Sequence, residues 1–186
     1  KRNAQWRYRV GASAPAAWNT PTFDASKWNV GTSGFGYGDN LEKTTLPMRG
    51  KHAVVYIRTE FQVPNPEQIK GLSLGINYDD GFVAYLNGKE VVRKGVEGQG
   101  ASATNIVSHE AKGHETFSIP MPAGRLRKGK NILAIEGHNV RLTSSDFLLD
   151  PYLFVPEAMN APLSSAGRFL SLVRLIDNPS GDRYGS

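Results

Sequence analysis

The stretch FVAYLNGKEVVR, residues 82–93, decides the fold class of this chain. Two short apolar runs flank the dipeptide Asn87-Gly88. Both central residues of a type I′ turn have positive φ, a conformation that asparagine and glycine tolerate best, so the dipeptide predicts a tight β-hairpin. We therefore expect antiparallel strands over residues 82–86 and 90–93.

Segments on both sides of this hairpin alternate with the two-residue period of a half-buried strand. In residues 54–63, for example, Val55, Ile57, Phe61 and Val63 share one face. Residues 131–138 begin apolar on both faces, which favours a central strand covered on both sides. We expect further strands over 6–10 (at a sheet edge), 54–63, 72–78, 116–119, 131–138, 147–149 and 152–155.

The composition agrees with one all-β domain. The 186 residues include 20 Gly and 11 Pro, which suits many turns between short strands, and 39% are hydrophobic, enough for a core. Residues 11–49 lack periodicity but carry Trp18, Trp28, Phe35 and Tyr37. A loop of this length is either functional or pinned by its aromatic rings, and we expect Trp28 to pack in the core.

The pattern changes after Pro162. Residues 164–177 place Phe169, Leu172, Val173 and Ile176 at helical spacing, so we predict an amphipathic helix there. We expect a sandwich domain over 1–156 and a tail over 157–186. This helix either caps the sandwich or docks onto a neighbouring domain or a partner subunit.

Several function classes are excluded. The formal net charge of +5 is dispersed, without a basic stripe interleaved with aromatic residues, so we expect no nucleic-acid partner. There is no cysteine for a disulfide, a thiolate zinc site or a nucleophile, and no apolar run long enough for a membrane span. The opening residues lack a signal-peptide apolar region, so we expect a cytosolic protein, a mature form or a piece of a longer polypeptide.

Three segments occur in order: DDGFVAYLNGKEV (79–91), GKNILAIEGHN (129–139) and SSDFLLD (144–150). Together they resemble the galactose-binding-like jelly-roll domain found in β-galactosidase-type glycosidases and in large secreted bacterial proteins. The resemblance implies an all-β, antiparallel jelly-roll β-sandwich, here with a short C-terminal helical tail. It also implies an extracellular, periplasmic or cell-surface location.

The resemblance points to a shallow glycan site at one rim of the sandwich. Sugar hydroxyls need polar partners and sugar rings stack on aromatic rings, and both residue types occur in the predicted loops and strand ends. The candidate ligand-binding residues are Tyr37, Asp39, Asp79, Asp80, His138, Asn139, Arg141 and Asp146. Turn chemistry can also explain Asp79 and Asp80, and a hydrogen-bonded pair can explain His138 and Asn139.

Members of the family often hold a structural calcium ion, which prefers several oxygen ligands. The resemblance implies Asp39, Asp146 and Asp150 as candidate calcium ligands. We predict no other cofactor.

The leading hypothesis is a non-catalytic carbohydrate-binding accessory module of a larger secreted protein, with a glycan or polysaccharide as partner. The alternative is a structural jelly roll that docks onto a neighbouring domain or subunit without binding sugar. A glycosidase or polysaccharide lyase is third, because glycoside cleavage needs two opposed carboxylates. Asp79 and Asp80 are sequence neighbours, and pairing Asp80 with Glu136 or Asp146 is the remaining possibility.

Overall fold

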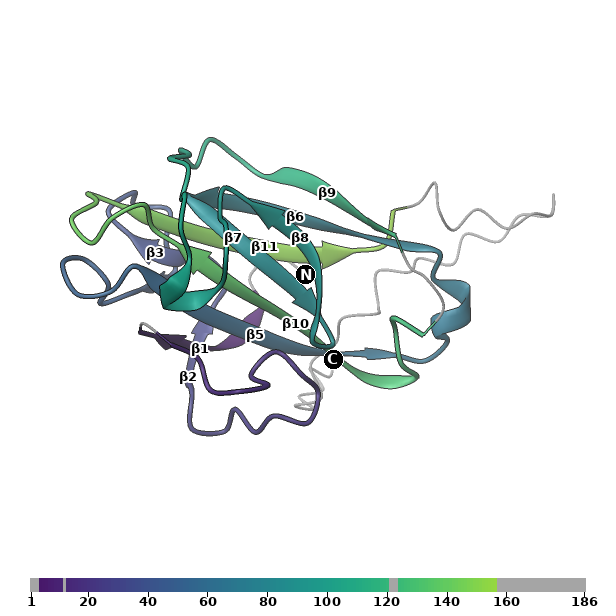
Figure 1. Cartoon of the computed structure of the whole chain (residues 1–186). Helices are drawn as coiled ribbons and strands as arrows, with labels where there is room; N and C mark the ends of the chain where they lie inside the picture. Colours follow the sequence, from purple (N-terminus) through teal and green to yellow (C-terminus); the bar gives the residue numbers. More distant parts are fainter. Residues whose placement is uncertain (1–3, 12, 121–123, 157–186) are drawn as a thin grey trace, which may run out of the picture.

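The alternating segments form strands in two facing sheets, in a computed structural model that describes residues 4–11, 13–120 and 124–156 (Figure 1). The first sheet has the order β2 (Asn29–Thr32), β1 (Gln5–Val10), β5 (Val54–Val63), β10 (Gly129–His138), β7 (Gly81–Leu86), β8 (Lys89–Lys94). The second has the order β4 (Thr44–Thr45), β3 (Phe35–Tyr37), β11 (Phe147–Phe154), β6 (Gly71–Asp79), β9 (Glu115–Pro120). The described helical turns are the 3₁₀ segments η1 (Pro66–Gln68) and η2 (Gly100–Ser102).

The chain passes repeatedly from one sheet to the other, as in a jelly roll. From β5 to β11, only β7 and β8 are consecutive strands of one sheet, and the other connections cross between sheets. All neighbouring strands are antiparallel except the short pair β3 and β4. The prediction of an all-β sandwich is therefore confirmed.

The hairpin at Asn87-Gly88 joins β7 and β8 as predicted. Asn87 has φ 52° and Gly88 has φ 83°, the positive values that a type I′ turn requires. Strand β10 is central, between β5 and β7, and its residues from Asn131 onward are buried. A large apolar cluster from both sheets fills the space between them, including Phe35, Ile57, Leu74, Phe82, Ile135 and Leu149.

Two predictions about the strands are wrong. Residues 147–149 and 152–155 belong to the single strand β11, which continues through Pro151. The Pro151 carbonyl accepts a bond from Ser33 Oγ, on the side away from β6, so the missing N–H removes no bond to β6. Strand β1 does not lie at an edge, because β2 pairs with its outer side.

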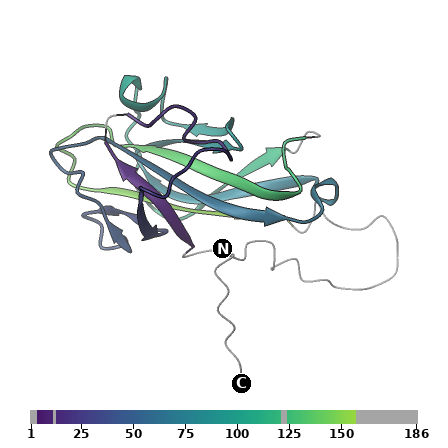
Figure 2. The ribbon, with the colours of Figure 1, turned by 90° about the horizontal axis from the view of Figure 1, so that it is seen from below.

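The aromatic loop between β1 and β2 covers the outer face of the first sheet (Figure 1, Figure 2). Trp18 and Trp28 are 8% and 7% exposed and stack on one another, with ring centroids 6.0 Å apart. The buried Arg58 of β5 fixes this loop, donating from Nη1 to the Phe23 carbonyl and from Nη2 to the Thr20 carbonyl. The long loop is thus pinned by its aromatic rings.

The predicted helix over 164–177 lies outside the described residues, as does the whole of the predicted tail, residues 157–186. Within the part of the chain that is described, there is no helix with the length and apolar character needed to cross a membrane.

Replacing Arg58 with methionine should loosen the loop while keeping most of the apolar stem. The change leaves two partly buried carbonyls without their donors, so we expect the free energy of unfolding to fall by about 2–3 kcal/mol. Urea denaturation measures this loss, and a red shift of tryptophan fluorescence would report exposure of Trp18 and Trp28. Arg9→Met, at an exposed position of β1, is the control and should change stability by less than about 0.5 kcal/mol. Equal stability of the two variants would contradict the role of Arg58.

Candidate functional site: the acidic rim

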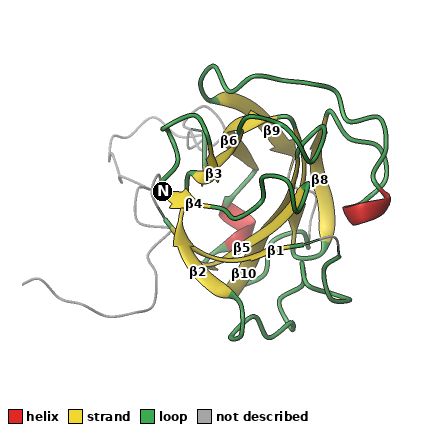
Figure 3. Cartoon of the chain, turned by 90° about the vertical axis from the view of Figure 1, so that its left-hand side faces the viewer, coloured by secondary structure: helices red, strands yellow, loops and turns green. Residues whose placement is uncertain are grey.

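Three loops meet at one end of the sandwich, which we call the rim. They are residues 38–43 after β3, the turn Asp79-Asp80 between β6 and β7, and residues 139–146 between β10 and β11. Figure 3 looks at this end of the molecule, where loops cross the space between the two sheets. The topology explains the meeting, because the strands that precede these loops, β3, β6 and β10, all end at this end of the sandwich.

Three carboxylates converge at the rim. Asp39, Asp79 and Asp146 each place one oxygen within 4.8 Å of those of the other two. Gly38 makes this approach possible, because it has φ +94° and a Cβ there would lie 2.5 Å from the Ser145 carbonyl oxygen. The loop after β3 therefore packs directly on the loop before β11.

The charged forms of these acids are disfavoured. Asp79 is only 4% exposed, and burial raises its pKa to about 8, with further contributions from the charges of Asp80 and Asp146. Burial also raises the pKa of Asp39, followed by the charge of Asp146. Carboxylate oxygens that gather in this way can offer hard ligands to a cation.

Asp80 has a different role from its neighbour Asp79, to which it is joined by a cis peptide bond. Its Oδ1 accepts a hydrogen bond from the backbone N–H of His109 at 3.0 Å, and its Oδ2 accepts one from that of Val140 at 2.6 Å. The backbone N–H of Asp80 donates to the carbonyl of His138 at 3.1 Å. Asp80 thus ties three segments together, and both of its side-chain oxygens are occupied.

Tyr37 and Asn139 are buried behind the rim. Asn139 Nδ2 donates to Tyr37 Oη and to the carbonyl of Asp146, both at 2.9 Å, and Tyr37 Oη donates to the carbonyl of Ser144. Burial raises the pKa of the Tyr37 hydroxyl. These two predicted ligand-binding residues therefore position the loop that carries Asp146.

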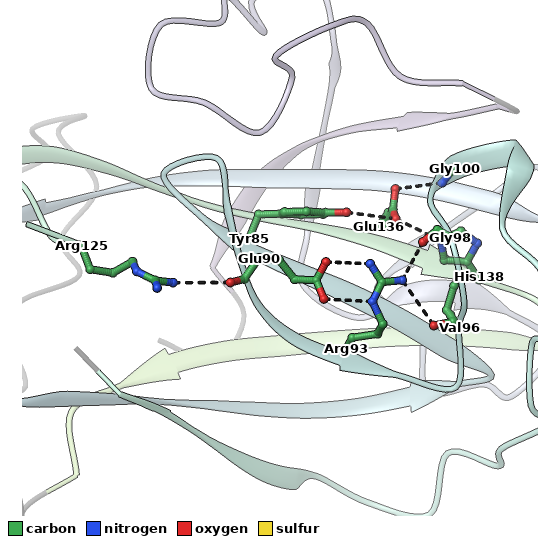
Figure 4. A network of polar contacts seen from close by, with 9 residues as sticks. All are labelled: Tyr85, Glu90, Arg93, Val96, Gly98, Gly100, Arg125, Glu136 and His138. Carbon is green, nitrogen blue, oxygen red and sulfur yellow. Dashed lines mark hydrogen bonds and ion pairs between the residues drawn. The ribbon is translucent and has the colours of Figure 1, made fainter. Parts of the chain in front are cut away.

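His138 lies apart from the acids and is fully buried on the outer face of the first sheet. Its Nε2 is 3.5 Å from Oε1 of Glu136, without the alignment of a hydrogen bond (Figure 4). Glu136 accepts hydrogen bonds from Tyr85 Oη and from the backbone N–H of Gly100, which fixes η2 onto the sheet. A side chain enclosed in this way does not reach a glycan, so the structure does not place His138 at the predicted site.

Arg141 and Asp150 complete the predicted set. Arg141 is exposed at the rim, and its guanidinium has no hydrogen bond or ion pair within the described part of the chain. Asp150 lies elsewhere, on the outer face of β11, where it accepts a bond from Ser33 Oγ at 2.7 Å and pairs with His114 at 3.2 Å. The predicted group of Asp39, Asp146 and Asp150 is thus not brought together; Asp79 takes the place of Asp150.

Sequence reasoning missed His109. Its backbone N–H binds Asp80, and its ring stacks on Tyr78 with centroids 4.1 Å apart. The surrounding segment, residues 95–113, has no periodicity, so no pattern indicated that it folds back onto the rim.

Sugars could stack on the long loop only if its aromatic rings were exposed, and they are not. The rings of Trp18, Trp28, Phe35 and Tyr37 are all buried. A glycan at the rim would therefore depend on polar contacts more than on these aromatic rings.

No known family model matches the sequence, and no curated protein matches it. Among solved structures, a calcium-binding mutant of Bacteroides uniformis beta-glucuronidase 2 matches with a TM-score of 0.51 and 20% identity, over 81% of this chain and 17% of that one. A glycosyl hydrolase family 2 member from Bacteroides cellulosilyticus matches with a TM-score of 0.48 and 12% identity, over 80% of this chain and 20% of that one. The chain thus spans a fifth or less of these enzymes, and the likeness to the first shows a shared sandwich fold.

Replacing Asp80 with alanine should destabilise the rim. The substitution leaves two backbone N–H groups without their charged acceptor, and we expect the free energy of unfolding to fall by about 2–4 kcal/mol. Chemical denaturation measures the change, and hydrogen exchange at His109 and Val140 should become faster. Asp24→Ala, at an exposed loop position, is a control with a smaller expected effect. Unchanged stability and exchange in Asp80→Ala would contradict the tether.

Asp79 should make stability depend on pH in metal-free buffer. Because its pKa rises from 3.8 to about 8 on folding, the folded state binds more protons than the unfolded state between these values. The contribution of Asp79 to stability therefore falls as the pH rises through this window. Asp79→Asn should remove that decline, which urea titrations at pH 5 and pH 8 would measure. An identical pH dependence in wild type and Asp79→Asn would contradict the assignment.

Proposed function

We propose that this chain is a non-catalytic carbohydrate-binding accessory module of a larger secreted protein, with its site at the rim. The observation that carries the proposal is that the rim loops carry the exposed Arg141 and the partly exposed carboxylates of Asp39 and Asp146. Sugar hydroxyls are both donors and acceptors, and such a rim offers partners of both kinds. The outer face of the first sheet is closed by its loops, which leaves the rim as the better site.

The same geometry favours a role without catalysis. Glycoside cleavage requires two carboxyl groups on opposite sides of the scissile bond. Asp80 uses both oxygens to hold backbone N–H groups, and Glu136 is 2% exposed with both oxygens hydrogen-bonded. Each acid pair considered from the sequence, Asp80 with Glu136 or with Asp146, therefore includes at least one carboxyl group whose two oxygens are already hydrogen-bonded.

The fold likeness to part of a β-glucuronidase agrees with attachment to a carbohydrate-active protein, although it extends to the fold alone. A galactose-binding-like module of this kind would work outside the cytoplasm, in the periplasm, at the cell surface or in the medium.

Docking onto a neighbouring domain or subunit is the second candidate. Three large apolar side chains, Leu41, Val107 and Leu142, are 55%, 63% and 47% exposed on loops around the rim. Exposed apolar residues of this kind occur at protein interfaces. The predicted helix over 164–177 would be a further docking element.

A polysaccharide array tests the leading proposal. We expect wild-type protein to bind at least one glycan class, and Arg141→Ala to weaken that binding about tenfold, because it removes the charged donor. Arg127→Ala is the matched control, since Arg127 is an exposed arginine that precedes β10 at the opposite end of the sandwich, and it should bind as wild type does.

No binding by a folded protein would contradict the proposal and favour docking. Release of reducing ends or unsaturated products from the same glycans would instead show an enzyme.

A further inference from the structure

We propose that His109 is a protonation-dependent clasp that holds the segment before β9 on the rim. The charged imidazolium can make both of the polar contacts that the ring faces, whereas the neutral ring can make only one. The clasp is independent of glycan binding, because it depends on contacts within the chain and does not require a sugar.

Both ring nitrogens of His109 face hydrogen-bond acceptors. Nδ1 lies 3.0 Å from the backbone carbonyl oxygen of Tyr78, and Nε2 lies 2.9 Å from Oε1 of Glu115. A carbonyl oxygen and an ionised carboxylate accept hydrogen bonds but do not donate them. Each ring nitrogen therefore needs a proton of its own, and the imidazolium is the form that carries two.

The neutral ring of His109 satisfies only one of these two acceptors, because it carries a single N–H. Its other nitrogen then presents a lone pair to the lone pairs of an oxygen, which is an unfavourable contact. Histidine side chains ordinarily change charge at about pH 6.5. The two contacts are therefore both made in mildly acidic solution, and one of them is lost in alkaline solution.

The packing of the ring restricts its movement away from these acceptors. The His109 ring stacks on the ring of Tyr78, with centroids 4.1 Å apart and an interplanar angle of 4°. Tyr78 is itself buried and packs edge-on against Phe82. Burial, followed by the charge of Glu115, raises the pKa of the Tyr78 hydroxyl to about 12. Tyr78 therefore stays neutral while histidine titrates, and it adds no charge change of its own.

The described lysines and arginines do not replace the imidazolium as a partner of Glu115, which forms no ion pair with any of them. The other charged or titratable groups on the segment and on the elements packed against it are Asp80, Lys94, Glu110, Lys112 and His114. Lys94 lies over the ring of Phe117, and His114 pairs with Asp150. Asp80 accepts backbone N–H groups with both oxygens.

The clasp acts on the rim through the backbone of the same residue. The backbone N–H of His109 donates to Oδ1 of Asp80 at 3.0 Å, so the side chain and the main chain of His109 attach the segment at adjacent points. The segment is also held by the N–H of Gly113, which donates to Oδ1 of Asn77 at 3.0 Å, a bond between groups that do not titrate. Loss of one side-chain contact should therefore loosen the segment near Asp80 without releasing it.

Hydrogen exchange of the His109 amide in the whole chain tests the clasp, because this N–H binds Asp80. After correction for the intrinsic exchange rate, we expect its protection factor in the wild type to fall roughly fivefold between pH 5.5 and pH 8, as one partly screened hydrogen bond is lost. Glu115→Gln should remove most of this fall, because a glutamine side chain can accept from a ring N–H and can also donate to a ring nitrogen that lacks a proton. Glu110→Gln is the matched control at an exposed position of the same segment, and it should keep the fall.

Two comparisons separate the clasp from other effects of pH. Asp79 also titrates in this range, but its effect is common to the three proteins, so the difference between Glu115→Gln and wild type isolates the His109 contact. The amide of Ile135 in the central strand β10 reports global unfolding, and it should show the same pH dependence in all three. The proposal is overturned if the protection factor of the His109 amide in the wild type does not fall, or if it falls equally in Glu115→Gln and Glu110→Gln.

Discussion

The structure of the rim depends on the two hydrogen bonds that the Asp80 carboxylate accepts from backbone N–H groups. It joins the turn between β6 and β7 to the segment before β9 and to the start of the loop after β10. Charge-assisted bonds of this kind are stronger than neutral ones, and both are shielded from water because Asp80 is 3% exposed. With the turn fixed in this way, the preceding residue, Asp79, is held among two other acids. The hydrogen bonds that fix Asp80 therefore also keep Asp79 in an environment that disfavours its charged form.

The loops divide the molecule into closed and open regions. The aromatic loop and η2 cover the outer face of the first sheet and are held there by Arg58 and Glu136. These buried charged groups hold loops in place by binding backbone atoms. At the rim, by contrast, Arg141 is exposed and Asp39 and Asp146 are partly exposed, and the functional proposals converge there for that reason.

Much of the fold could be predicted from the sequence because its signals are local. The Asn87-Gly88 turn and the alternation in β5 and β10 depend on neighbouring residues alone. The continuation of β11 through Pro151 could not be predicted, because it depends on β3 ending before it reaches that proline. The position of β1 likewise depends on the distant strand β2, which the turn-rich sequence of its loop conceals.

The candidate site was predictable in part for the same reason. Its residues lie at strand ends, where turn residues mark them, and Asp39, Asp79 and Asp146 do meet. The separate roles of Asp79 and Asp80 follow from the segments that fold over them, and the displacement of Asp150 follows from strand register. In that register Asp150 lies opposite Asn77, two positions from the Leu148–Asp79 pair. There it accepts a hydrogen bond from Ser33 and pairs with His114. No local pattern contains this information.

The central claim is that the rim is the glycan-binding surface of the module. Nuclear magnetic resonance of ¹⁵N-labelled protein during addition of a glycan that binds on the polysaccharide array tests it most directly, because each backbone amide reports separately. The account predicts saturable shifts at residues 38–40, 79–81 and 139–147, with Gly100 and Asn131 unchanged. Shifts centred on other parts of the sandwich, or an unchanged spectrum at the highest glycan concentration, would contradict it.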